Sequence, residues 1–290
     1  IQDKKGEEKA TEIWARAALR NPRDLYLLER VDREILIEHS RASDFVQDVS
    51  YPLNMTWAGV LEAMGRLYGR VDLAEESKRV KEEIRRQSWN GTWFCDHAVR
   101  NHTGLRPYNH YELKLQEKDV SETCQYYAFF FGVATPESHP ALWKRLVDEF
   151  GPGRRPSSWE VIPSAAFMGY YMRLECLSRA GLKSQIMKEV REYFKPMAER
   201  TGTLWEHAYP SASCCHAFAS HVALSLVRDV LGLDVDAVNK EVSCRETGCD
   251  LQNCQVVLPV PGGEIVVGWT NNSGRREWAV KLPGDWRVNR

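Results

Sequence analysis

The sequence has almost no excess charge and no long apolar run. Its 39 Lys and Arg residues nearly balance 40 Asp and Glu residues, which leaves a formal net charge of -1. Such a chain has no overall field that would attract nucleic acid or an anionic membrane surface. The longest apolar stretch, residues 126–134, is far shorter than the roughly 18 residues that a membrane-spanning helix needs. We therefore expect no nucleic acid and no membrane as partners, and a neutral ligand.

Cysteine is also scarce, because eight residues in a chain of 290 are too few for a disulfide scaffold. Cys124 and Cys176 lie within apolar helical patterns, where we expect them to be small buried hydrophobic residues. Cys244, Cys249 and Cys254 recur at intervals of five residues, which is not the spacing of a zinc site. Whether two of these three cysteines form a disulfide stays an open question.

Apolar residues recur at three- and four-residue steps over residues 52–68, which predicts a helix that ends at Gly69. Residues 72–84 form a strongly charged helical pattern, so the two segments predict a helical hairpin. The same pairing returns twice, in residues 120–133 with 140–150 and in residues 163–177 with 182–200.

The first helix of each pair is apolar on most sides, whereas the second keeps one charged face. This contrast predicts an inner ring of enclosed helices and an outer ring of half-exposed ones. A closed toroid of six hairpins needs about a dozen helices, and about eight can be counted, including a weakly marked one at residues 10–19. The predicted fold class is mainly α, with helical hairpins that resemble an incomplete (α/α)6 toroid.

The pattern changes near the C-terminus. Residues 255–258, 264–269 and 275–282 are rich in β-branched and aromatic residues, and turn sequences with Gly, Pro and Asn separate them. These features predict a small antiparallel, β-sandwich-like domain. We place the helical domain at residues 1–236 and the β domain at residues 237–290.

Function in a ring of helical hairpins is expected in the loops that enter the inner helices, because these loops meet at one mouth. The corresponding segments are rich in aromatic, His, Asn and acidic residues: 40–54, 89–122, 159–164 and 203–216. Aromatic faces beside carboxylates and amides suit a sugar, whose rings have apolar faces edged by hydroxyl groups. Trp57, Trp93 and Trp205 could supply such faces, although the helical spacing of Trp57 favours a place in the core.

Hydrolysis of a glycoside needs two carboxyl groups, one on each side of the bond that breaks. Glu206 is the strongest candidate, since it follows the turn at Gly202, adjoins the indole of Trp205 and precedes a segment with His216. The alternative is a solvated glutamate on a surface loop.

Several phrases along the chain resemble bacterial α-L-rhamnosidases of glycoside hydrolase family 78, which have a six-hairpin toroid. They are SETCQYYAFFF at 121–131, TGTLWE at 201–206, SCCHAFASH at 213–221, DFVQDVSYP at 44–52 and PSAAFMG at 163–169. Together they extend over residues 38–232 in the order of the family.

The resemblance implies inverting hydrolysis of terminal α-L-rhamnosyl residues from glycans or glycosides, with Glu206 as the general base. The substrate would be a rhamnosyl glycoside, and this chemistry needs no metal or organic cofactor. It also implies a binding site formed by several further residues, for which capping or core roles are the alternatives: His216, Trp205, Glu122, Gln125, Glu38 and Trp93.

The sequence departs from the family pattern at several points. Ala165, Tyr170 and Cys215 stand where the family has asparagine, and the acidic segment that carries the family's general acid is not found. The chain opens at Ile1 rather than Met, so we expect an upstream β-sandwich and catalytic segment in the same protein. Two alternatives to a complete enzyme therefore stay open, namely a catalytically incomplete fragment and a non-catalytic carbohydrate-binding relative. The sequence does not decide whether the protein is located in the cytoplasm or in the periplasm, and we prefer the cytoplasm.

Overall fold

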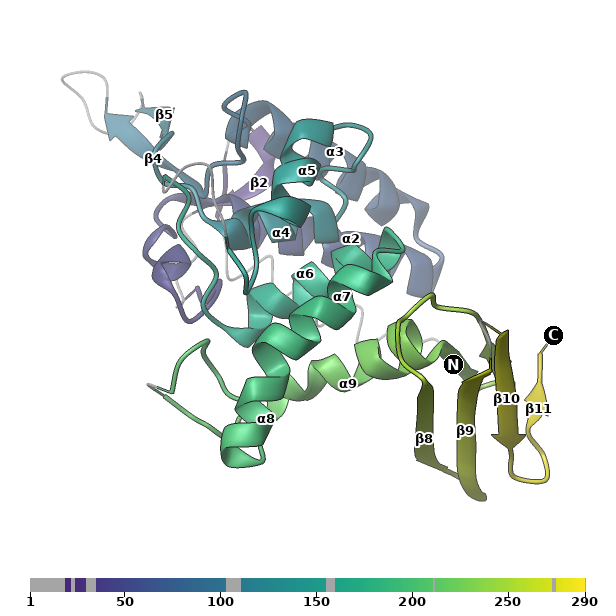
Figure 1. The fold of residues 1–290 in the computed structure, drawn as a ribbon. Helices are drawn as coiled ribbons and strands as arrows, with labels where there is room; N and C mark the ends of the chain where they lie inside the picture. Colours follow the sequence, from purple (N-terminus) through teal and green to yellow (C-terminus); the bar gives the residue numbers. More distant parts are fainter. Residues whose placement is uncertain are drawn as a thin grey trace. The chain divides into compact units, whose positions relative to one another are not determined.

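The computed structural model describes residues 19–21, 24–29, 35–102, 111–154, 160–210, 212–272 and 275–289. The chain divides into two compact units, residues 1–173 and 174–290. The structure is helical with small antiparallel sheets (Figure 1), as expected for a mainly α fold with a β region. No helix among the described residues is long and apolar enough to cross a membrane.

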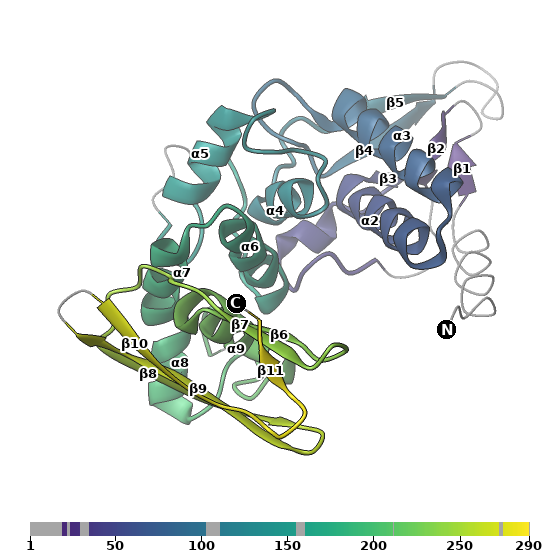
Figure 2. The same ribbon diagram turned by 90° about the vertical axis from the view of Figure 1, so that its right-hand side faces the viewer.

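The first unit contains the expected hairpin α2 (Tyr51–Tyr68) and α3 (Val71–Ser88), whose helices lie side by side in Figure 2. Ser50 caps α2, because its hydroxyl accepts a hydrogen bond from the Leu53 N–H. Gly69 ends the helix in the left-handed region with a φ of 67°. The hairpin therefore has the start and stop signals that the sequence indicates.

The second expected pair is α4 (Glu122–Phe130) and α5 (Pro140–Asp148). Residues 122–129 of α4 are all buried, whereas α5 buries only Leu142 and Leu146. The contrast between enclosed and half-exposed helices is thus present in this pair. The ring arrangement itself stays a prediction.

Helix α6 (Phe167–Arg179) crosses the division between the units and begins four residues later than its pattern predicts. Its Arg173 is fully buried and donates to the carbonyl groups of Leu146 and Val147 at the end of α5. A cation at this end of a helix complements the helix dipole. Gly151 leaves room for the guanidinium, since a Cβ there would lie 2.5 Å from the Arg173 Nε.

Two small sheets complete the first unit. Strands β1 (Leu19–Asn21) and β2 (Asp24–Glu29) pair with each other, and β3 (Val49–Ser50), β4 (His97–His102) and β5 (Tyr111–Leu115) form a second antiparallel sheet. A 3₁₀ turn, η1 (Arg41–Asp44), precedes β3. The helix predicted at residues 10–19 lies outside the described residues, except that Leu19 belongs to β1.

The second unit begins its helical part with α7 (Lys183–Glu189), the π-helical stretch η2 (Val190–Phe194) and α8 (Lys195–Thr201). The sequence pattern predicts one regular helix here. Pro196 supplies no N–H and crowds the preceding turn, which explains the widened turn before it. After a loop come η3 (Ala217–His221), α9 (Val222–Ser225) and a second π-helical stretch, η4 (Leu226–Leu231).

Strands follow directly after Gly232. Only glycine fits easily here, because φ is 93° and a Cβ at this position would lie 2.1 Å from the Arg245 carbonyl oxygen. The first sheet joins β6 (Leu233–Asp236), β7 (Glu241–Cys244) and β11 (Arg287–Val288). The second is the antiparallel sheet of β8 (Asn253–Val260), β9 (Gly263–Asn272) and β10 (Arg275–Lys281), which Figure 2 shows along its length. The expected C-terminal strands are therefore present, and the domain boundary at residue 236 stays a prediction.

The core of the β region forms around Trp269, whose indole N–H donates to the Leu231 carbonyl at 2.9 Å. The Arg276 guanidinium lies 3.9 Å from the ring centre of Trp269. Cys249 is buried beside them, and all eight cysteines of the chain are free thiols. Cys124 and Cys176 are buried, as their patterns predict.

Candidate functional site

Glu38 has no exposed surface, and its carboxylate joins three segments of the first unit. One oxygen accepts hydrogen bonds from the Ser164 hydroxyl at 2.6 Å and from the Gly169 N–H at 3.0 Å. The other accepts from the Thr123 hydroxyl at 2.9 Å and from the Ala165 N–H at 3.2 Å. These bonds connect the residue to the first turn of α4 and to the start of α6. They also explain why α6 begins late, because the backbone at 165 binds a carboxylate.

Glu122 lies next to this network and is 1% exposed. Its carboxylate forms an ion pair with Arg154 and accepts hydrogen bonds at 3.1 Å from the Tyr126 hydroxyl and the Ser164 N–H. Burial raises the pKa of Glu122 to about 7, although the charges of Arg154 and Arg173 act in the opposite direction. Ser164 thus binds both predicted glutamates, and these two residues lie close together.

Gln125 holds the segment before β4 in place. Its amide oxygen accepts from the Phe94 N–H at 3.0 Å, and its amide nitrogen donates to the Phe94 carbonyl at 2.8 Å. The adjacent Trp93 is 7% exposed and lies between the Arg145 guanidinium, 4.8 Å from its ring centre, and the Phe150 ring at 5.8 Å. The substrate-binding roles of Gln125 and Trp93 stay predictions.

Asp96 is a buried acid that the sequence analysis did not select. It has no exposed surface and accepts two hydrogen bonds from Ser121, from the hydroxyl at 2.6 Å and from the N–H at 2.7 Å. Burial, assisted by the charge of Asp119, raises the pKa of Asp96 to about 8. An acid inside the apolar stretch WFCDHAV at 93–99 is the signal that could have identified it.

In the second unit, Glu206 lies in a half-buried loop after α8. Its N–H donates to the Ser213 carbonyl at 2.9 Å, and the Ser213 N–H donates to its carboxylate at 3.4 Å. The His216 N–H donates to the Leu204 carbonyl at 2.9 Å. Two stretches of chain, 203–206 and 213–216, therefore lie side by side and bring Glu206 and His216 into one local structure.

Aromatic side chains surround this local structure. Trp205 is 6% exposed and donates from its indole nitrogen to the Thr201 hydroxyl at 2.8 Å. Tyr209 is 55% exposed and stacks on His207, with 5.8 Å between ring centres. The exposed Phe218 contacts the His216 ring in a tilted arrangement, with 5.7 Å between ring centres. The glutamate is thus accompanied by aromatic surface that faces solvent.

The predicted residues therefore form two groups, each within one unit. Glu38, Glu122, Gln125 and Trp93 belong to the first unit, and Trp205, Glu206 and His216 belong to the second. Among the described residues, no group of three or more His, Cys, Asp or Glu side chains could hold a metal ion.

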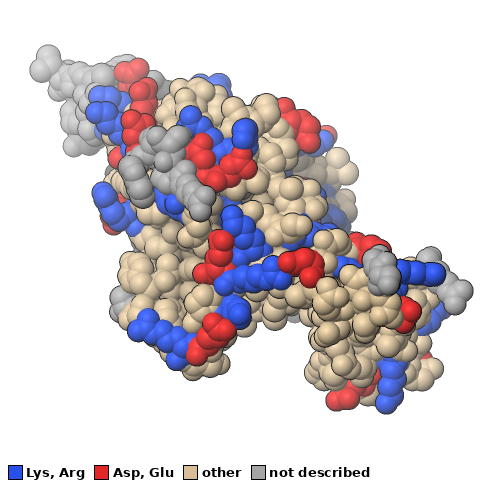
Figure 3. Space-filling model, in the orientation of Figure 1, with Lys and Arg blue, Asp and Glu red and all other residues tan. Residues whose placement is uncertain are grey.

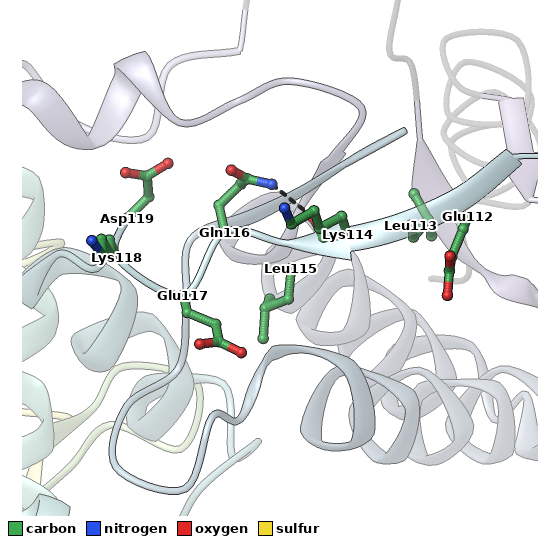
Figure 4. A pocket seen from close by; sticks show the side chains of 8 residues that line it. All are labelled: Glu112, Leu113, Lys114, Leu115, Gln116, Glu117, Lys118 and Asp119. Atoms are coloured by element: carbon green, nitrogen blue, oxygen red, sulfur yellow. Dashed lines mark hydrogen bonds between the residues drawn. The ribbon is translucent and has the colours of Figure 1, made fainter. Parts of the chain in front are cut away.

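An open hollow of about 900 Å³ lies along β5 and the loop after it. Figure 4 shows the eight side chains of residues 112–119 that line it, with carboxylates and lysines on one stretch of chain. Its Asp119 carboxylate is 2.8 Å from the Nε2 of the buried His97. None of the predicted site residues lines this hollow. Charges of both signs are also mixed over the face that Figure 3 shows.

No family model matches the chain, and comparison with curated proteins finds no matching sequence. Solved structures do match. A family 78 rhamnosidase of Bacillus sp. GL1 has a TM-score of 0.70 and 19% identity, over 91% of this chain and 28% of that one. A rhamnosidase from Klebsiella oxytoca with rhamnose bound has a TM-score of 0.52 and 15% identity, over 77% of this chain and 43% of that one.

A third match is the α-L-rhamnosidase of Streptomyces avermitilis in complex with L-rhamnose, with a TM-score of 0.54 and 12% identity. It covers 81% of this chain and 22% of that one. At these identities the likeness concerns the fold, and the chain spans less than half of each of the three structures. The chain thus has a fold related to that of family 78 rhamnosidases and corresponds to a part of their length.

Proposed function

We propose that this chain is part of a glycoside hydrolase that removes terminal α-L-rhamnosyl residues with inversion of configuration. The observation that carries the proposal is the fold likeness to a family 78 rhamnosidase over 91% of the chain. Two further similar structures hold rhamnose. In this proposal the helical pairs of residues 1–236 form part of an (α/α)6 toroid, and residues 237–290 form its β domain.

We assign the general base to Glu206. In an inverting reaction one carboxyl group protonates the leaving oxygen, and the other removes a proton from a water on the opposite face of the sugar, about 6.5–9.5 Å away. Glu206 is half-buried, so water can reach it, and the Ser213 N–H orients its carboxylate. His216 lies on the neighbouring stretch of chain and is our candidate for binding a sugar hydroxyl.

The residues of the first unit have a supporting role in this proposal. Glu38 and Gln125 already use their oxygens for hydrogen bonds within the protein. Glu122 is paired with Arg154. Their contacts connect the segments before α4 and α6, which are the loops expected to carry substrate contacts. The general acid is unassigned within this chain, and we place it in the part of the longer rhamnosidases that the chain does not span.

A non-catalytic sugar-binding relative is the second candidate. It is favoured because Ala165 and Cys215 stand at positions where the family has asparagine. Neither side chain can present an amide to a sugar hydroxyl. In the structure the Ala165 N–H binds Glu38 instead. Both candidates predict sugar binding and differ in turnover.

The experiment that separates them is hydrolysis of 4-nitrophenyl α-L-rhamnoside, whose phenolate leaves without help from a general acid, by this chain and by Glu206→Gln. We expect the variant to lose about 10²–10⁴-fold in kcat, the usual contribution of a general base. Glu199→Gln is a matched control, since Glu199 is an exposed glutamate on α8. NMR of the first product should show the β anomer.

The other outcomes are equally informative. Equal rates for the parent and Glu206→Gln would remove the base assignment. Rhamnose binding without hydrolysis in either protein would favour the non-catalytic candidate. Neither binding nor hydrolysis would contradict both.

A further inference from the structure

Two adjacent cysteines lie in the stretch of chain that pairs with the Glu206 segment. Cys215 is exposed and Cys214 is half-buried. All eight cysteines belong to the part of the chain that the structure describes, and Cys215 alone among them is exposed. Burial raises the pKa of the half-buried Cys244 and Cys254 thiols, which lowers their thiolate fraction at neutral pH. A thiol reagent in solution therefore reaches Cys215 first.

The backbone of the two cysteines is tied to the segment of Glu206. The Thr203 hydroxyl donates to the Cys214 carbonyl. The Ser213 hydroxyl donates to the Cys215 carbonyl at 3.1 Å and accepts from the Cys215 N–H at 3.3 Å. The Ser213 N–H in turn donates to the Glu206 carboxylate at 3.4 Å. A change in the backbone at 214–215 is thus passed to Glu206 through Ser213.

We propose that Cys214 and Cys215 form a redox modification site that reacts with a low-molecular-weight disulfide and closes a disulfide between adjacent residues. The Cys215 thiolate attacks one sulfur of the small disulfide, whose S–S bond breaks and releases one thiol. The Cys214 thiolate then attacks the Cys215 sulfur of the mixed disulfide and releases the second thiol. The protein loses two electrons and two protons, and the small disulfide is reduced to two thiols.

Closure of this bond changes the backbone. Neighbouring Cα atoms across a trans peptide are about 3.8 Å apart, whereas those of a disulfide are usually about 4.4–6.8 Å apart. The peptide between Cys214 and Cys215 must therefore twist, and the resulting bond is strained and readily reduced. Such a bond is suited to reversible modification.

If Glu206 is the general base, as proposed above, the twist displaces its Ser213 partner and lowers turnover. A misplacement of about 1 Å typically costs about 10²-fold in rate. The oxidised protein should therefore lose activity on this scale and regain it with dithiothreitol. This consequence rests on the proposed function, whereas the modification itself does not.

The test is to treat the reduced chain with oxidised glutathione and to analyse its peptides by mass spectrometry. The peptide with both cysteines should lose two hydrogens and keep no glutathione. Cys214→Ser should retain one glutathione on Cys215, because it lacks the resolving thiol. Cys215→Ser should stay unmodified at this peptide, and Cys244→Ser should react like the parent.

Glutathione that stays on Cys215 in the parent, or reaction at Cys244 and Cys254 with none at this peptide, would overturn the modification site. Closure with unchanged activity would overturn the coupling to Glu206. Closure in a chain without rhamnosidase activity would leave the modification standing and would contradict the proposed enzyme. The two proposals can therefore fail separately.

Discussion

Among individual residues, Asp96 carries a carboxyl group with no exposed surface, and burial raises its pKa to about 8 from 3.8. Between these two values the folded chain keeps the proton, whereas the unfolded chain releases it. The folded state then binds more protons, so its stability falls as the pH rises through this window. The buried acid therefore favours the folded state less at neutral pH than at mildly acidic pH.

Asp96→Asn should remove this pH dependence. An asparagine can accept from the Ser121 N–H and donate to the Ser121 hydroxyl, as a neutral acid can. We expect the variant to gain stability relative to the parent between about pH 5 and about pH 8, measured by urea unfolding at both values. Asp148→Asn, at an exposed position at the end of α5, is the control. A constant difference between the parent and Asp96→Asn across the window would contradict the assignment.

At the scale of elements, Gly69 allows α2 to end and the chain to turn into α3. Its φ of 67° lies in the left-handed region, and a Cβ there would meet nothing within 4 Å. Gly69→Ala should therefore cost about 1 kcal/mol through backbone strain alone. Gly69→Asn should cost less, since asparagine tolerates this region better. Equal midpoints for the parent and Gly69→Ala in urea unfolding would contradict this cause.

The elements also show what the sequence can predict. The hairpin of α2 and α3 follows from periodicity and from local signals at Ser50 and Gly69, which act within a few residues. The pairing of β4 with β3 cannot be predicted in this way, because the two strands lie far apart in the sequence. The start of α6 likewise depends on Glu38, more than 100 residues earlier in the chain. Long-range contacts of this kind leave no local pattern.

The candidate site shows the same limit at the scale of the whole molecule. Glu122 and Glu206 lie in phrases that resemble a family, and the same resemblance implied Glu38. Asp96 belongs to no such phrase and was missed, although the structure buries it completely. Family resemblance therefore located residues by motif, while burial and hydrogen bonding revealed how most of them are held.

Sugar binding is the property of the whole chain that both candidate functions share, and it can be measured without turnover. A ligand that binds only the folded state at about 100 times its Kd adds about 2.7 kcal/mol of stability. We expect L-rhamnose to raise the Tm of the chain in proportion to the logarithm of its concentration, and D-glucose to have no effect. His216→Ala should reduce the shift, because His216 lies beside the Glu206 segment. Equal Tm values with both sugars would contradict both candidate functions, since each of them predicts rhamnose binding by this chain.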